Sequence, residues 1–139
     1  MKDMTIKAET ENLHAVFDFV VDGLMELQQT PTFIRQCKLS AEEVFLNICS
    51  YSYESEIGSV YITRDIVNKG SDKEVVISFS DSGIPFNPLT ADDPDLTAEL
   101  EDRQIGGLGI FLVKELMDEV SYEYEDGHNI LTMKKALEK

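Results

Sequence analysis

Residues 106–113 read Gly-Gly-Leu-Gly-Ile-Phe-Leu-Val, and this stretch decides how the rest of the chain is interpreted. Its three glycines allow a tight turn and a close backbone approach that side chains would block. The apolar run predicts a helix over residues 109–117, and a helix N-terminus offers unpaired N–H groups and the positive end of its dipole. The stretch is therefore typical of a phosphate-binding loop. A turn that needs glycine only for its geometry explains the same residues.

A second candidate site lies on a helix predicted over residues 33–53. Apolar residues surround most of the circumference of this helix, which indicates that it is largely buried. One narrow polar stripe remains, and it consists of Glu43, Asn47, Ser50 and Glu54. Two simpler explanations stay open. In the first, the stripe merely faces solvent. In the second, Ser40 and Glu43 form a capping box that starts a new helix near residue 40.

A third candidate is the carboxylate at the end of a strand predicted over residues 74–81. Val75, Ile77 and Phe79 share one face of this strand, and Asp81 has the same parity. We therefore expect Asp81 to point toward the core, where a carboxylate is costly unless something pairs with it. A turn over residues 82–85 follows, and an Asp-Ser-Gly turn would also explain Asp81 on structural grounds alone.

The remaining pattern predicts an α+β fold. Further strands are expected over residues 4–9, 60–68, 120–125 and 129–135, and a first helix over 13–27, capped by Thr10 or Asn12. Hairpin turns are expected at residues 69–73 and at Asp126-Gly127. Strand pairs with helices between them favour a two-layer sandwich, in which the helices lie on one face of a largely antiparallel mixed sheet. We expect a single domain over residues 1–139.

The acidic segment before the glycines is the longest stretch without a predicted element. Residues 87–105 contain two prolines, six acidic residues and few large apolar side chains. A loop of this length in a compact domain is usually functional or disordered. Its position predicts a lid, over about residues 88–105, that covers whatever the glycines hold. The simpler explanation is a flexible loop that has no role in binding.

Composition limits the classes of partner. The net charge of −15 argues against a nucleic-acid interface, which needs a basic face, and favours a partner with a basic surface. No run is long and apolar enough to span a bilayer. Cys37 and Cys49 would lie roughly 18 Å apart on one helix, too far for a disulfide. We therefore expect reduced thiols and a cytoplasmic location.

The three candidate sites, in this order, resemble the GHKL-type ATP-binding domain that is shared by gyrase, a heat-shock chaperone, histidine kinases and a mismatch-repair ATPase. Residues 42–53 are similar to the N box of that family, residues 81–88 to its first glycine box, and residues 106–113 to its second. Within the family the chain is most similar to the small anti-sigma factor serine kinases of bacteria. It departs from many members at Tyr51, where they carry a histidine.

The resemblance implies a role for each matching residue. Asn47 would hold Mg²⁺ through its amide oxygen, and Glu43 would be the general base. Asp81 would accept a hydrogen bond from the adenine amino group, and Gly83 would let the backbone pass close to the purine. The phosphates would lie against Gly106, Gly107, Leu108, Gly109 and Ile110. Two further ATP contacts are expected: Thr132 through water, and Arg103 on the γ-phosphate from its position at the end of the lid.

The activity implied by the resemblance is ATP-dependent phosphorylation of a serine. The implied substrate is an anti-anti-sigma protein of the STAS type, and the implied second partner is a sigma factor that the chain sequesters. Members of the family often dimerise, so a homodimer is also implied. The alternative is an ATP-sensing module that binds a partner without catalysis, because ATP that orders a lid also reshapes a surface.

Overall fold

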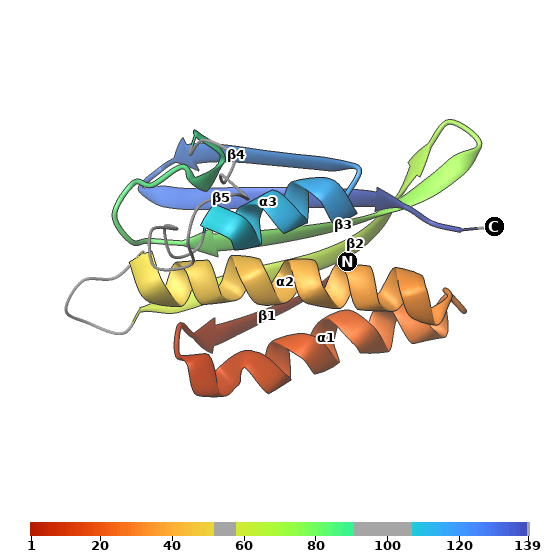
Figure 1. The fold of residues 1–139 in the computed structure, drawn as a ribbon, viewed down its shortest axis with the longest axis horizontal. Helices are drawn as coiled ribbons and strands as arrows, with labels where there is room; N and C mark the ends of the chain where they lie inside the picture. The colour runs from red at the N-terminus through yellow and green to blue at the C-terminus, as the bar shows by residue number, and fades with distance from the viewer. Residues whose placement is uncertain (52–57, 91–106, 139) are drawn as a thin grey trace.

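The computed structural model describes residues 1–51, 58–90 and 107–138, and three helices and a five-stranded sheet form its two layers (Figure 1). The helices are α1 (Leu13–Glu26), α2 (Pro31–Tyr51) and α3 (Gly107–Leu116). The strands are β1 (Lys2–Lys7), β2 (Ser59–Lys69), β3 (Asp72–Asp81), β4 (Glu119–Glu125) and β5 (His128–Ala136). Short 3-10 helices cover Thr10–Asn12 and Pro88–Thr90. The predicted α+β sandwich is therefore confirmed.

The strands are ordered β1-β2-β3-β5-β4, and every described pair is antiparallel. The three helices lie on one face of this sheet, with α2 between α1 and α3 (Figure 1). Alternate strand residues point toward the helices, as a period of two requires. The fully buried side chains between the layers include Val16, Val20, Leu24, Phe33, Phe45, Ile62, Ile77, Phe79 and Met133.

The start of α2 follows directly from its sequence. Pro31 occupies the first helical position, where its fixed φ is favourable and its missing N–H costs nothing. The hydroxyl of Thr30 accepts a hydrogen bond from the Phe33 N–H at 3.2 Å, which makes Thr30 the N-cap. The predicted cap of α1 is wrong. Asn12 stands at the N-cap position, but its side chain donates to the Lys7 carbonyl, and Thr10 lies in the preceding 3-10 helix.

The helix α2 runs from Pro31 to Tyr51 without a break, so the capping box proposed for Ser40 and Glu43 is wrong. Both residues lie in the middle of the helix, where the backbone N–H groups already have helical partners. Ser40 is fully buried, and its hydroxyl has no hydrogen-bond partner among the described residues. A hydroxyl buried in this way carries a desolvation cost that nothing repays.

We expect the substitution Ser40→Ala to raise the free energy of unfolding by about 1 kcal/mol. The change removes an unsatisfied buried hydroxyl, and alanine also has the higher helix propensity. Urea denaturation should show a higher midpoint at unchanged slope. Ser50→Ala, on the exposed side of the same helix, measures the propensity effect alone. A midpoint for Ser40→Ala at or below that of the wild type would contradict this expectation.

The two hairpins form at the predicted turns. Asp126 and Gly127 have φ of 53° and 79°, which are the positive values that a two-residue turn between β4 and β5 requires. Gly70, with φ of 65°, lies in the corresponding turn between β2 and β3. These turns fix the register of both hairpins, and the register decides which side chains reach the helical face.

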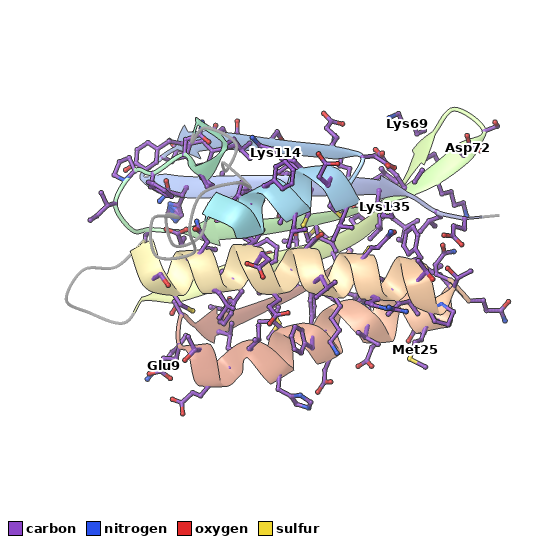
Figure 2. The ribbon with its side chains drawn as sticks, in the orientation of Figure 1. Glu9, Met25, Lys69, Asp72, Lys114 and Lys135 are labelled. Carbon is purple, nitrogen blue, oxygen red and sulfur yellow. The ribbon has the colours of Figure 1, made fainter. Side chains whose placement is uncertain are left out.

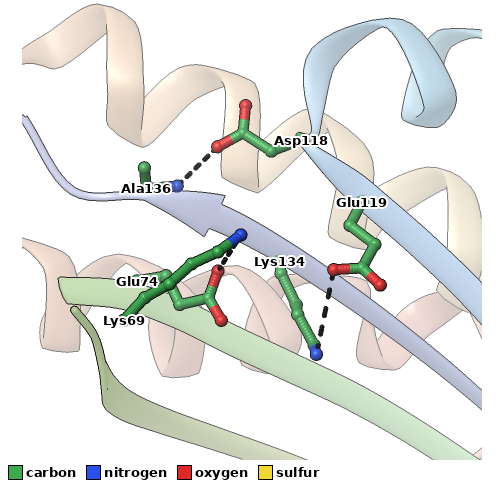
Figure 3. Close-up of polar contacts among 6 residues, drawn as sticks. All are labelled: Lys69, Glu74, Asp118, Glu119, Lys134 and Ala136. Carbon is green, nitrogen blue, oxygen red and sulfur yellow. Dashed lines mark hydrogen bonds and ion pairs between the residues drawn. The ribbon is translucent and has the colours of Figure 1, made fainter. Parts of the chain in front are cut away.

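Polar contacts link neighbouring segments at one end of the β3–β5 ladder (Figure 3). The Asp118 carboxylate accepts a hydrogen bond from the Ala136 N–H at 2.6 Å, and Lys134 lies 3.8 Å from Glu119. Lys69 lies 3.9 Å from Glu74, which pairs with Ala136 in the ladder. The same ladder ends, at its other end, in the pair Asp81 and Asn129. The Lys134–Glu119 pair is solvent-accessible and contributes little stability, whereas Glu74 is only 7% exposed.

Lys135 of β5 connects the sheet to α3 through a hydrogen bond. Its ammonium donates to the Leu116 carbonyl at 2.8 Å, in the last turn of α3, and lies 5.6 Å from the ring centroid of Phe33 on α2 (Figure 2). A cation at a helix C-terminus interacts favourably with the dipole and with the unpaired carbonyls. Lys135 therefore links the C-terminal end of α3 to the sheet beside α2.

Candidate functional site

The candidate site is a narrow cavity between α2, the ends of β3 and β5, and the turn after β3. Its free volume is about 20 Å³, which is room for about one water molecule. Apolar side chains form most of its wall, with four polar residues among them. The lining residues are Val44, Asn47, Ile48, Phe79, Asp81, Phe86, Pro88, Tyr122, Asn129 and Leu131. The structure thus brings Asn47 of α2 and Asp81 of β3 to one place.

Asp81 points toward the helical face, as its parity predicts, and only 4% of it is exposed. Its Oδ1 atom accepts two hydrogen bonds, from the Gly83 N–H at 2.9 Å and from the Asn129 amide at 3.0 Å. No described residue donates to Oδ2. The buried carboxylate is therefore paired on one oxygen, while the other remains able to accept a hydrogen bond from a ligand.

Asn129 also belongs to this cavity, although the sequence patterns did not single it out. It is 5% exposed, and its amide nitrogen donates to Asp81 Oδ1 and to the Ile84 carbonyl at 2.9 Å. Its amide oxygen accepts from the Phe86 N–H at 3.0 Å and from the Tyr122 hydroxyl. The signal was present in the sequence. Asn129 shares its parity with Leu131 and Met133, just as Asp81 shares that of Phe79.

Glu43 and Asn47 lie one turn apart on α2, and both are partly exposed. Asn47 lines the cavity, and Glu43 lies beyond the lining residues. Burial raises the pKa of the Glu43 carboxyl above its ordinary value, and the negative charge of Glu42 raises it further. Glu43 therefore takes up a proton more readily than an ordinary glutamate does.

The helix α3 begins at Gly107, two residues before the predicted start. Gly107 and Gly109 therefore lie within the first turn of the helix. The first four N–H groups of a helix have no intrahelical partner, and here they belong to Gly107, Leu108, Gly109 and Ile110. The Ile110 side chain is buried in the core, so only its backbone can meet a ligand.

Other predicted site residues lie elsewhere. Gly106, Arg103 and residues 91–105 of the predicted lid lie outside the described residues. Thr132 pairs with Ser78 and Ser121 in the sheet, and its parity is opposite to that of Asn129 and Leu131. Its side chain therefore lies on the face that carries no described helix. The structure does not bring Thr132 together with Asp81.

Both cysteines lie on α2, as predicted, and both are free. Their separation of twelve helical positions corresponds to about 18 Å. Burial raises the pKa of the Cys37 thiol to about 12 and that of Cys49 to about 11. Because the thiolate is the reactive form, neither cysteine has the character of a catalytic nucleophile.

The described ranges contain no cluster of three or more histidine, cysteine or acidic side chains placed to hold a metal ion. Nor does any helix in these ranges have the length and apolar character needed to cross a bilayer.

Comparisons with known proteins agree with this geometry. A family profile described as the histidine kinase-like ATPase domain matches residues 6–135. The serine/threonine-protein kinase BtrW of Bordetella bronchiseptica is 31% identical over 96 residues, which are 68% of this chain and 65% of BtrW. The serine-protein kinase RsbW of Bacillus mycoides is 25% identical over 101 residues, 70% of this chain and 61% of that protein. The match therefore spans less than two thirds of either relative.

A solved structure shows the same fold. The RsbU and RsbW domains of Rv1364c from Mycobacterium tuberculosis superpose with a TM-score of 0.65 over 100% of this chain and 33% of that one, at 14% sequence identity. The profile covers almost the whole sequence. The chain belongs to the histidine kinase-like ATPase domain family.

Proposed function

We propose that the protein is an ATP-dependent protein-serine kinase of the anti-sigma type. The observation that carries this proposal is the cavity that Asn47 and Asp81 both line, together with the Oδ2 atom of Asp81, to which no described residue donates. Membership of an ATPase domain family supports ATP as the ligand of this cavity, and the relatives named serine-protein kinases support the reaction.

In this proposal the adenine amino group donates to Asp81 Oδ2, and the apolar side chains of Val44, Ile48 and Leu131 pack against the purine. A free volume of about 20 Å³ is too small for a purine ring. Binding therefore requires the rim to open. Phe86 is the side chain placed to move, because it lines the cavity and is also 41% exposed.

The polyphosphate is proposed to lie at the N-terminal end of α3, where unpaired N–H groups and the helix dipole favour an anion. Glycines at positions 107 and 109 have no side chain that could block approach to their own N–H groups. The amide oxygen of Asn47 is a hard ligand that suits Mg²⁺, which takes its other ligands from phosphates and water. Gly106 and Arg103 remain sequence-based candidates for the same phosphates.

Glu43 is the proposed general base. It would accept the proton of an attacking serine hydroxyl on the substrate protein, one helical turn from Asn47. A raised pKa makes a carboxylate a stronger base, and a base is most effective when its pKa lies near the working pH. Most of the acceleration in phosphoryl transfer comes from positioning and charge neutralisation, so Glu43 supplies only the proton step.

The proposed partners are a STAS-type anti-anti-sigma protein as substrate and a sigma factor as the sequestered protein, in the cytoplasm. The net charge of −15 gives a field that attracts a basic surface. A homodimer is part of the same proposal, since it follows from the same family resemblance.

The test is incubation of the protein with Mg-ATP and a STAS-type anti-anti-sigma protein. We expect stoichiometric appearance of phosphoserine on the partner, detected by mass spectrometry, together with ADP. Tight ATP binding without phosphoserine or ADP would contradict the kinase and favour the ATP-sensing module. Failure to bind ATP would contradict both.

A further inference from the structure

We propose that Asn129 is a positioning residue that fixes which oxygen of Asp81 faces the purine, and thereby sets the preference for a 6-amino purine. The inference rests on the nucleotide site proposed above. It concerns a residue that neither the motifs nor the resemblance singled out, and it follows from the contacts of one buried side chain.

The amide of Asn129 has every partner it needs in one orientation only. Its oxygen accepts from two donors, the Phe86 N–H and the Tyr122 hydroxyl. Its nitrogen donates to Asp81 Oδ1 and to the Ile84 carbonyl, with a longer contact of 3.5 Å to the Gly83 carbonyl. Rotating the amide by 180° would place its N–H groups against the Phe86 N–H and its oxygen against the oxygens of Asp81 and Ile84. The network therefore fixes the amide orientation from its surroundings.

The fixed amide determines which carboxylate oxygen of Asp81 remains open to a ligand. Oδ1 of the carboxylate is occupied by two donors, one from Asn129 and one from Gly83. An ionised carboxylate has only acceptor sites, so the open oxygen, Oδ2, presents an acceptor to the ligand. A 6-amino group donates to this acceptor. A 6-oxo group would bring a second acceptor against it and leave both unpaired.

The same amide holds the turn that follows Asp81. Asn129 contacts the main chain at Ile84 and at Phe86, so β5 holds both the carboxylate and the turn that shapes the cavity rim. Without the Asn129 amide, Asp81 keeps one donor on Oδ1, and its carboxylate is free to rotate about the last side-chain bond. The acceptor is then no longer held toward the purine.

The test compares affinities for two triphosphates, ATP and purine riboside 5′-triphosphate, which lacks the 6-amino group. We expect the wild type to prefer ATP by about 10-fold or more, the value of one charge-assisted hydrogen bond. Asn129→Ala should bring this ratio to within about 3-fold of unity, chiefly by weakening ATP. Asn68→Ala, the same change at an exposed position on β2, should keep the wild-type ratio.

A purely structural role would weaken both ligands equally and leave the ratio unchanged, and that result would overturn the inference. Tyr122→Phe keeps the ring but removes one donor to the Asn129 oxygen, so it should lower the ratio by a smaller factor. If Asn129→Ala does not fold, an unchanged ratio in Tyr122→Phe overturns the inference in its place. Asn129→Ser, which retains a hydroxyl donor, should recover part of the preference.

Asp81→Asn distinguishes a failure of the proposed nucleotide site from a failure of the role proposed for Asn129. If this variant keeps the ATP preference, Asp81 does not contact the amino group and the proposed nucleotide site fails. If Asp81→Asn loses the preference while Asn129→Ala keeps it, the nucleotide site stands and the inference about Asn129 alone is overturned.

Discussion

The substitution Asp81→Asn is expected to weaken ATP binding by about 100-fold or more, because a site built around one polar contact rejects a mismatched partner strongly. Gly83 and Asn129 both donate to the Oδ1 position. The new side chain would therefore direct its oxygen to these donors and its amide N–H₂ to the purine. A donor would then meet the adenine amino group, which is also a donor.

Isothermal titration with Mg-ATP measures this effect directly. Asp22→Asn makes the same chemical change at an exposed position on α1 and should leave the affinity unchanged. An Asp81→Asn protein that binds ATP within about 3-fold of the wild type would show that the buried carboxylate serves the fold and not the ligand.

The second large effect is expected from Glu43→Gln, which should reduce the rate of serine phosphorylation by about 10²- to 10⁴-fold. Glutamine has nearly the same shape but cannot accept the proton of the attacking hydroxyl. ATP affinity should be retained, since Glu43 does not line the cavity. Single-turnover phosphorylation and equilibrium binding, measured on the same preparation, separate the two quantities. Rates that stay within a few fold of the wild type would remove Glu43 as the base.

The pH dependence gives an independent check of the same residue. A general base works in its deprotonated form, so activity falls as the pH drops through its pKa. Burial raises the pKa of Glu43, and the acid limb of the wild-type profile should therefore lie at higher pH than for an ordinary glutamate. The charge of Glu42 raises that pKa further. Glu42→Gln should consequently move the limb to lower pH while activity persists.

Much of the fold could be predicted because the pattern is local. The alternation along residues 74–81 placed Asp81 on the buried face, and the Asp126-Gly127 pair gave the last turn. Predictions that depend on competition between local and tertiary forces were wrong. The Ser40 and Glu43 spacing matches a cap, yet burial of apolar side chains along α2 continues the helix through both.

The site was predictable only in part, for a related reason. Asp81 and Asn47 carry motifs that can be recognised in one segment. Asn129 acts through contacts with residues that precede it by more than 40 positions, and no local pattern specifies such partners. Thr132 was expected to contact ATP on the basis of the family resemblance alone, whereas strand parity places its side chain on the opposite face of the sheet.

The contacts of Asn129 have a consequence for the dynamics of the C-terminal hairpin. Opening of β5 would remove a donor from Asp81 and free the turn at Ile84 and Phe86. If nucleotide binds at the proposed site, an opened hairpin would therefore lose the contacts that hold it. Ligand that binds only the closed form must then suppress the opening in proportion to its concentration. Amide hydrogens of β4 and β5 should therefore exchange more slowly as nucleotide is added, although both strands are far in sequence from α2, which forms the other wall of the cavity.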